Sequence, residues 1–244
     1  QPQSDDTSAH DGDTNAFDVL EHVVLSVEQD VATTEDILRG LIVRARMPWL
    51  LRHHKRPLVL ALFSVLMGGV SLVIISVIAL VTGSPFVFPS LGPTAYLFFY
   101  RPGSVAASPR STLTGCALGI VGSYVILLIT GLAGAPPATL VGMTWSRVIA
   151  VALAFSLTTA LLVFLSVDHP PALATALLIA LGVFARPLSL VALYGGVVLL
   201  TAEAFLINHA AGLPYPLWRA NPRAFQRAVG EARASPPYAV PPEG

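Results

Sequence analysis

One short pattern occurs twice in this chain, as PSLGPTA at residues 89–95 and as PPALATA at residues 170–176, with an offset of 81 residues. In each copy a proline-broken start leads through Thr-Ala into a short apolar run. Each copy also lies between two longer apolar stretches, so the repeating unit is three hydrophobic segments. A unit with an odd number of segments is inverted when it is repeated in a membrane, as in many secondary transporters. The pattern therefore predicts an inverted repeat and favours a transport protein.

The composition of the chain is that of an integral membrane protein. Of the 244 residues, 54% are hydrophobic and only 11% are charged, and the mean hydropathy is +0.71. Soluble domains carry about 25% charged residues. A helix that crosses a membrane needs about 20 apolar residues, and several stretches of the chain reach that length.

Six apolar segments follow one another, and the second and fifth are short and broken by proline. The segments are residues 57–81, 85–100, 111–132, 148–167, 170–185 and 188–207. We therefore predict an all-α membrane protein with two inverted three-segment repeats, at about 57–132 and 145–209. In this arrangement the short second and fifth helices meet near the midplane of the membrane.

Hydrophilic regions flank the apolar part of the chain. Ten of the 14 acidic residues lie between Asp5 and Asp36, which predicts an acidic and largely disordered tail. The next region mixes apolar and basic residues, which fits an amphipathic helix on an anionic membrane surface or one packed on its own protein. The predicted domains are an acidic tail (1–32), a juxtamembrane segment (33–56), a transmembrane domain (57–209) and a C-terminal tail (210–244).

Basic residues predict the orientation in the membrane. Arg52, Lys55 and Arg56 precede the first segment, so the positive-inside rule places the N-terminus in the cytoplasm. Six crossings of the cell (inner) membrane then place the C-terminus there as well. Four crossings, with the two short segments as re-entrant hairpins, would leave both termini on the same side.

Several classes of function find no support in the sequence. No basic patch with interleaved aromatic residues indicates nucleic-acid binding. Cys116 is the only cysteine, so no cysteine-based zinc site is spelled out. The chain also lacks the HExxH and GxSxG motifs and a convincing Ser/His/Asp grouping. We therefore expect neither an enzyme nor a bound cofactor or metal.

The two short helices predict a binding site where they begin. Proline breaks a helix that reaches it from the N-terminal side but is tolerated in the first turn. A segment of 16 residues spans only about 24 Å as a helix, so its start lies below the membrane surface. Non-helical backbone at that depth must lie inside protein or beside a watery cavity. Each helix start carries unpaired N–H groups and a partial positive charge, so two opposed starts form a site for a small anion.

The candidate substrate-binding residues come from these two starts. Ser90, Thr94 and Thr175 offer hydroxyl donors, and His169 immediately precedes the second start. The full set is Ser90, Gly92, Thr94, Ala95, His169, Pro171, Ala174 and Thr175. The alternative interpretation is packing alone, because proline and glycine are frequent in spanning helices and Ser and Thr bond to their own backbone.

Ionisable side chains in an apolar region are costly and usually functional. Asp168, His169 and Glu203 are therefore candidates for proton coupling. The alternatives are a surface role at the bend for Asp168 and His169, and for Glu203 a position at the interface or a pairing with an arginine. Arg101 and Arg110 are candidates for guiding anions to the inner mouth, or they anchor loops to lipid headgroups.

Glycines indicate close helix contacts. Gly115 and Gly119 form a GxxxG pattern, and Gly68 and Gly69 add small residues to the first segment. The 81-residue offset also aligns Gly115 with Gly196. Such packing surfaces favour a homo-oligomer, with a dimer as the first expectation.

The region from about residue 51 to residue 219 resembles the HPP family of integral membrane proteins, named for a His-Pro-Pro motif. The resemblance is carried by HPPA at 169–172, FPSLGPTA at 88–95, RPGS at 101–104, SPR at 108–110 and PYPLW at 214–218. Some plant and cyanobacterial members are nitrite transporters, so the resemblance implies transport of a small monovalent anion. The family is usually described with four spanning segments, which agrees with six if the two short helices are counted as re-entrant.

We therefore expect a membrane transporter for a small monovalent anion, with nitrite as the first choice, held between two opposed helix starts. A passive anion channel, an intramembrane enzyme, and a membrane sensor or scaffold whose acidic N-terminal region recruits a partner stay open as alternatives. The expected partners are a small inorganic anion, the lipid bilayer and a second copy of the chain.

Overall fold

The computed structural model describes residues 47–223, 225–227 and 230. The predicted acidic tail (1–32), most of the juxtamembrane segment and the end of the C-terminal tail lie outside these residues. Within the described part all regular structure is helical, which confirms the all-α prediction there. The elements are α2 (Met47–His53), α3 (Arg56–Thr82), α4 (Leu91–Tyr100), η1 (Val105–Ala107), α5 (Pro109–Ile129), α6 (Ala138–Val141), α7 (Trp145–Phe164), α8 (Pro171–Ala180) and α9 (Pro187–Ala210).

Four helices are long and apolar enough to cross a membrane: α3, α5, α7 and α9, with 27, 21, 20 and 24 residues. At about 1.5 Å per residue these helices are about 30 to 40 Å long, which matches a hydrocarbon core of about 30 Å. They correspond to the first, third, fourth and sixth predicted segments. The chain is therefore an integral membrane protein.

The helices α4 and α8 are shorter than the segments that predicted them. Each has ten residues, or about 15 Å of helix, because the residues before each start are not helical. Helix α4 holds Pro93 in its first turn, and α8 starts with Pro171 at its first position. Proline is accepted there because the first turn needs no N–H donor from it.

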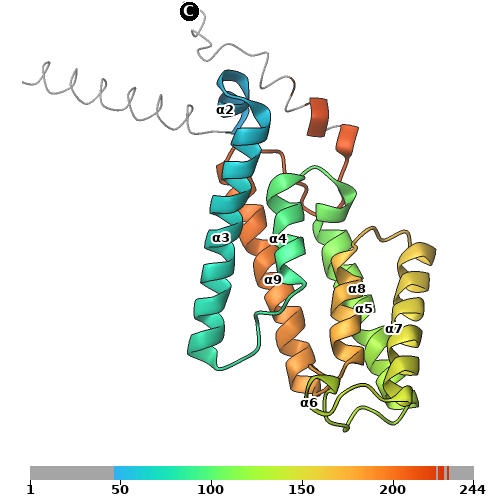
Figure 1. Ribbon diagram of the computed structural model, residues 1–244. Coiled ribbons are helices and arrows are strands. Elements are labelled where there is room, and N and C mark those ends of the chain that lie inside the picture. Colours follow the sequence, from blue (N-terminus) through green and yellow to red (C-terminus); the bar gives the residue numbers. More distant parts are fainter. Residues whose placement is uncertain (1–46, 224, 228–229, 231–244) are drawn as a thin grey trace, which may run out of the picture. The chain divides into compact units, whose positions relative to one another are not determined.

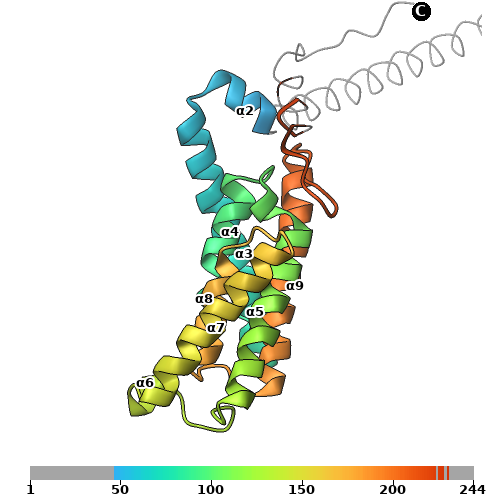
Figure 2. The same ribbon diagram turned by 90° about the vertical axis from the view of Figure 1, so that its right-hand side faces the viewer.

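The long helices run in two opposite directions (Figure 1). Helices α3 and α5 descend in this view, whereas α7 and α9 ascend. Helix α4 begins about half-way along the spanning helices and runs back to the end where α3 begins. Helix α8 also begins about half-way and runs the opposite way, which the view turned by 90° shows as well (Figure 2).

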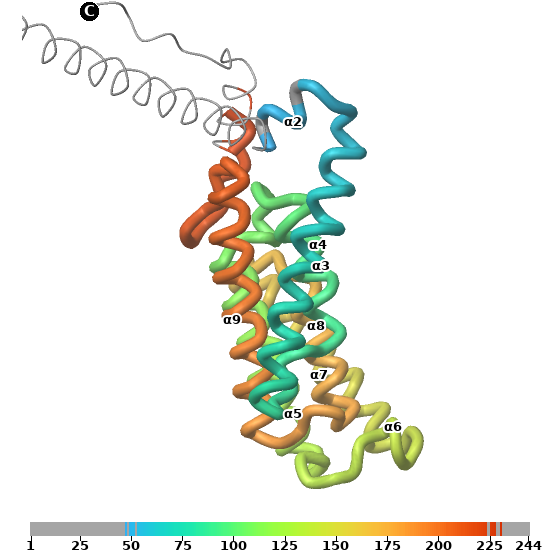
Figure 3. The backbone as a smooth tube through the Cα atoms, turned by 90° about the vertical axis from the view of Figure 1, so that its left-hand side faces the viewer, coloured from blue at the N-terminus to red at the C-terminus, as the bar shows by residue number. Residues whose placement is uncertain are grey.

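The packing divides into two sets of helices around a central contact between α5 and α9. Helix α4 packs on α3 and α9, and α8 packs on α5 and α7. Figure 3 shows α3 and α9 together, with α4 and α8 behind them. The largest apolar core joins α4, α8 and α9 through Phe98, Ile179 and Val197. The outer faces of α3 and α7 expose large apolar side chains such as Leu58 and Phe164, as expected of surfaces that face lipid.

Local features recur at the 81-residue offset. Each short helix starts with a backbone hydrogen bond from its first turn, and a left-handed glycine follows the end of both α5 and α9. At the short helices, Leu91 N donates to Phe88 O at 3.0 Å and Ala172 N donates to His169 O at 3.1 Å. After the long helices, Leu132 N donates to Leu127 O at 2.8 Å and Leu213 N donates to Asn208 O at 2.9 Å. The matched glycines are Gly131 (φ 70°) and Gly212 (φ 75°). Two segments that are 81 residues apart therefore share local conformation as well as sequence pattern.

Candidate functional site

Two hydroxyl groups join the starts of the short helices. The Oγ of Ser90, the residue at the N-cap position of α4, lies 2.7 Å from Oγ1 of Thr175 in the second turn of α8, and either atom can donate. Both side chains are at most 1% exposed. Thr94 Oγ1 donates to the carbonyl oxygen of Ser90 at 2.9 Å. The structure therefore brings together three of the predicted hydroxyl residues, at the meeting point of α4 and α8.

His169 lies just before α8 and is buried, with 1% of its surface exposed. Its Nδ1 is 3.0 Å from the carbonyl oxygen of Ala106 and 3.5 Å from Oγ1 of Thr112 on α5. His169 is outside the four spanning helices, and burial lowers the pKa of its imidazole to about 4. The ring is therefore neutral at neutral pH, so Nδ1–H donates to Ala106 and Nε2 carries a lone pair. The Nε2 atom is buried and has no hydrogen-bond partner.

Glycines on α5 hold the start of α8 close to that helix. A Cβ on Gly115 would lie 2.9 Å from Cβ of His169, and one on Gly119 would lie 2.7 Å from the carbonyl oxygen of Ala172. On α9, a Cβ on Gly196 would lie 2.5 Å from the carbonyl oxygen of Phe86, just before α4. The predicted close contacts of Gly115 and Gly119 are therefore confirmed. Each short helix is positioned by glycines of the long helix that follows the other short helix: α8 by α5, and α4 by α9.

The buried His169 is the first residue of a His-Pro-Pro triplet at 169–171. A family model described as "HPP, transmembrane region" matches residues 53–216. The chain belongs to the HPP family. No curated protein and no solved structure gives a significant match to the chain. In this HPP protein the triplet forms the turn into α8, and its histidine is held between η1, α5 and α8.

Two of the predicted ionisable residues lie apart from the hydroxyl pair. Arg101 and Asp168 are both exposed and line a cavity of about 440 Å³ near the start of α3, together with Arg56. The guanidinium of Arg101 also lies 5.5 Å from the centre of the Tyr100 ring. Arg110 lies in the first turn of α5, where its backbone N–H donates to the carbonyl oxygen of Trp218, and it is not among the residues that line this cavity.

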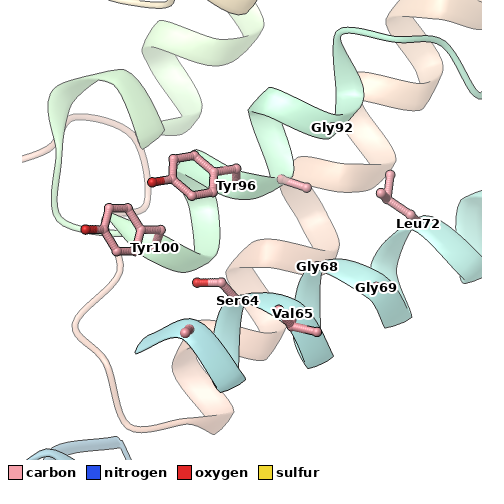
Figure 4. Close-up of a pocket in the computed structure, with 10 residues that line it drawn as sticks. Ser64, Val65, Gly68, Gly69, Leu72, Gly92, Tyr96 and Tyr100 are labelled. Carbon is pink, nitrogen blue, oxygen red and sulfur yellow. The ribbon is translucent and has the colours of Figure 1, made fainter. Parts of the chain in front are cut away.

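The other predicted binding residues do not converge on Ser90 and Thr175. Gly92 and Ala95 line a groove of about 500 Å³ between α3 and α4 (Figure 4). In this groove Tyr96 and Tyr100 stack with their ring centres 4.9 Å apart, opposite Ser64 and the two glycines of α3. Pro171 is buried and Ala174 is half-buried in α8. Small residues on α3 and α4, among them Gly68, Gly69 and Gly92, leave the space beside the two tyrosines.

Arg147 is a buried residue whose role the sequence did not indicate. It is 2% exposed and lies in the first turn of α7. Its Nη1 donates to the carbonyl oxygen of Ala180 at 3.0 Å, and its Nη2 donates to those of Ala135 and Pro136 at 3.2 and 2.9 Å. Ala180 is the last residue of α8, so the guanidinium caps that helix where the helix dipole favours a positive charge. A lone arginine before an apolar segment was the only signal, and it equally suits a residue at a lipid headgroup.

Proposed function

We propose that this HPP protein transports a small monovalent anion across the cell membrane, with nitrite as the first substrate to test. The observation that carries the proposal is the buried contact between Ser90 and Thr175 at the starts of two short helices that run in opposite directions. The family supports a membrane transport protein, and nitrite transport by some plant and cyanobacterial members suggests the anion. The HExxH and GxSxG motifs and a convincing Ser/His/Asp grouping, which would favour an enzyme, are missing from the sequence.

An inverted repeat is part of this proposal. The helices α3, α4 and α5 form one unit and α7, α8 and α9 the other, and corresponding helices run in opposite directions in Figure 1. The packing of α8 on α5 and α7 matches the packing of α4 on α9 and α3. The glycine contacts agree, since Gly115 with His169 and Gly196 with Phe88 are related by the same 81-residue offset. These matches support two units related by a two-fold axis in the membrane plane.

Helix starts provide the attraction for an anion. Each start carries about half a positive charge from its helix dipole. In the conformation described here the N–H groups of Leu91, Ala172 and Leu173 donate to the residues just before the helices, so an anion would have to replace these bonds to engage them. Because α4 and α8 begin about half-way along the spanning helices and run apart, their positive ends lie near the same depth. The Ser90 and Thr175 hydroxyls add two donors that an anion would engage in place of their bond to each other. His169 is neutral at neutral pH, so the attraction comes from the helix ends and the hydroxyls.

Transport requires the contact between the two hydroxyls to open. In the conformation described here Ser90 and Thr175 are buried against each other, which we interpret as a closed state. Movement of the packed set α3, α4 and α9 relative to the packed set α5, α7 and α8 would separate α4 from α8 and admit an anion from one side at a time. The cavity that holds Arg56, Arg101 and Asp168 lies near the start of α3, so we propose it as the mouth on the cytoplasmic side.

The orientation is also proposed. The chain crosses along α3 and returns through α4 to the end where α3 begins. In the second half it crosses along α7 and returns through α8 to the end where α9 begins. The chain then crosses the membrane six times, four of them as full helices. Arg52, Lys55 and Arg56 at the start of α3 support a cytoplasmic location for both termini. The homo-oligomer expected from the sequence stays a prediction.

The first test is nitrite uptake into vesicles that contain the purified full-length protein. Nitrous acid crosses bilayers unaided, so protein-free vesicles at the same pH set the baseline. We expect uptake above this baseline, with accumulation when an inward proton gradient is imposed. Flux that dissipates gradients without accumulation would indicate the channel alternative, and flux equal to the baseline would exclude nitrite.

The double variant Ser90→Ala/Thr175→Val tests the site itself. Each hydroxyl is expected to contribute about 1.5 kcal/mol or more to binding of a charged ligand, so the apparent affinity for the anion should fall about tenfold per hydroxyl. Uptake as a function of anion concentration measures this change.

A matched control is Thr201→Val on α9. The Thr201 hydroxyl is also buried, but it donates only to the carbonyl oxygen of Val197 in its own helix, at 2.7 Å. This variant should keep the affinity of the unmodified protein. Equal affinities in the double variant and in the control would rule out the hydroxyl pair as the binding site.

A further inference from the structure

Glu203 is the one acidic side chain within the four spanning helices. It lies on α9, seven residues before Ala210, or about 10 Å along the helix from its end. Helix α9 ends three residues after the predicted segment, so Glu203 is farther from the end of the helix than the predicted segment implied. The Glu203 side chain as a whole is half-buried, and its Oε2 atom is buried and makes no hydrogen bond.

The neighbour of this carboxyl is a serine in the middle of another spanning helix. Ser71 on α3 is 0% exposed and lies beside the Glu203 carboxyl. Neither Ser71 Oγ nor Glu203 Oε2 has a partner at hydrogen-bonding geometry. Ser71 is 15 residues from Arg56 and 11 residues from Thr82, or about 22 and 16 Å from the two ends of α3. The carboxyl therefore lies opposite hydrocarbon depth, well away from the headgroups.

The surroundings offer no compensating positive charge. Ile75 on α3 and Leu200 and Ala204 on α9 belong to the apolar core beside the carboxyl. Helix α9 packs on α3, α4 and α5. The titratable side chains of these helices are Arg56, Tyr96, Tyr100, Arg110, Cys116, Tyr124, Tyr194 and His209. None of them acts on the Glu203 carboxyl, and an unpaired carboxylate at this depth is costly.

We propose that Glu203 takes up and releases the proton that drives anion transport, with Ser71 as its hydrogen-bond partner. In the protonated state the carboxyl O–H donates to Ser71 Oγ, which gives a neutral pair suited to the apolar surroundings. On release the proton passes to water on the side that the carrier faces, and the Ser71 hydroxyl donates to the carboxylate. One proton carried with one monovalent anion makes the cycle electroneutral. The driving role rests on the proposed anion transport, whereas protonation of Glu203 does not.

The position of the pair connects it to the hydroxyl site. Helix α4 packs on both α3 and α9, the two helices that hold Ser71 and Glu203. Gly68, one turn before Ser71, faces the ring of Phe99 on α4, and Asn208 on α9 donates to the carbonyl oxygen of Phe98 at 3.3 Å. A change of charge on Glu203, between α3 and α9, can therefore act on α4, the helix that begins just after Ser90.

Labelling with dicyclohexylcarbodiimide tests the proton site without any transported substrate. This apolar reagent reacts with protonated carboxyl groups, and mass spectrometry of the full-length protein in lipid vesicles locates the product. We expect Glu203 to be labelled between pH 5 and 9, with the extent falling as the pH rises. Asp168 is exposed to water and should be labelled far less. Absence of labelling at Glu203, or labelling that does not change with pH, would overturn the proposal.

Two serine variants distinguish a specific partner from general burial. In Ser71→Ala the carboxylate loses its donor, so labelling of Glu203 should persist to higher pH. Ser76→Ala is the matched control, because Ser76 lies on the same helix but is exposed and donates to the carbonyl oxygen of Leu72 at 2.6 Å. The control should follow the pH profile of the unmodified protein. Identical profiles for the two variants would remove Ser71 from the proposal.

The variant Glu203→Gln tests the driving role. It should lose at least 90% of gradient-driven nitrite accumulation while it still exchanges internal for external nitrite, because exchange needs no net proton movement. Accumulation that follows the gradient as in the unmodified protein would overturn the assignment of Glu203. If Glu203 is labelled as expected but the unmodified protein moves no anion, then the proposed function fails and the proton site remains.

Discussion

Replacing Arg147 by methionine is expected to lower the free energy of unfolding by about 3 kcal/mol or more. The guanidinium donates to three backbone carbonyl oxygens, those of Ala135, Pro136 and Ala180. Each hydrogen bond from a charged donor contributes about 1.5 to 3 kcal/mol, and a buried acceptor left without a donor adds a further cost. Methionine preserves much of the apolar stem and none of the donors. The largest local effect should be on α8, which loses the cap at its end.

The thermal unfolding midpoint of the purified protein in one detergent measures this effect. Arg186→Met is the matched control, since Arg186 precedes α9 and its side chain is exposed. The control should unfold close to the temperature of the unmodified protein. A midpoint for Arg147→Met that equals that of the control would mean that the cap contributes little. Gly182→Ala provides a second check, because its Cβ would lie 2.6 Å from Arg147 Nη2 and its φ of +80° favours glycine.

The second large effect is expected at Gly119 on α5. In Gly119→Ala the new Cβ would lie 2.7 Å from the carbonyl oxygen of Ala172, a backbone atom that moves only if the start of α8 moves. Overpacking of this kind costs about 1 to 3 kcal/mol. The displaced start of α8 also carries Thr175, so we expect anion uptake to fall together with stability. The unfolding midpoint and the nitrite uptake assay measure the two effects.

Gly69→Ala is the matched control for this substitution. Gly69 lies within α3, where a Cβ would meet nothing within 4 Å. Alanine is favoured over glycine in a helix by about 1 kcal/mol, so this variant should be neutral or stabilised. The two substitutions are chemically identical, and opposite signs would show that the contact with α8 decides the result. A stabilised Gly119→Ala would contradict the close approach of α5 and α8.

Much of the fold could be predicted because it depends on lengths and on local chemistry. Uninterrupted apolar stretches predicted the four spanning helices, since only a helix satisfies its own backbone in hydrocarbon. The prolines predicted where α4 and α8 begin, because proline is accepted only in the first turn. The lengths of α4 and α8 were predicted less accurately than those of the four spanning helices. Residues 85–90 are apolar like the helix that follows, yet they are not helical.

The candidate site was predicted in part. Ser90 and Thr175 belong to segments 85 residues apart, and the prediction that two helix starts face one another placed them at one site. Gly92 and Ala95 were assigned to that site because they adjoin these residues in sequence, but a helix turns by about 100° per residue and carries them to the groove on α3. Neighbours in sequence therefore line different surfaces.

The sequence by itself determined the membrane class, the family resemblance and the positions of the proline-broken helix starts, because each depends on residues that are close along the chain. Only the tertiary structure decided which polar groups have partners. Arg147 caps a helix that starts 24 residues after it, and Glu203 faces Ser71 from a helix more than 100 residues away. Hydrogen bonds and charges act over a few ångströms in space, so partners that are distant along the chain are revealed only when the helices are packed.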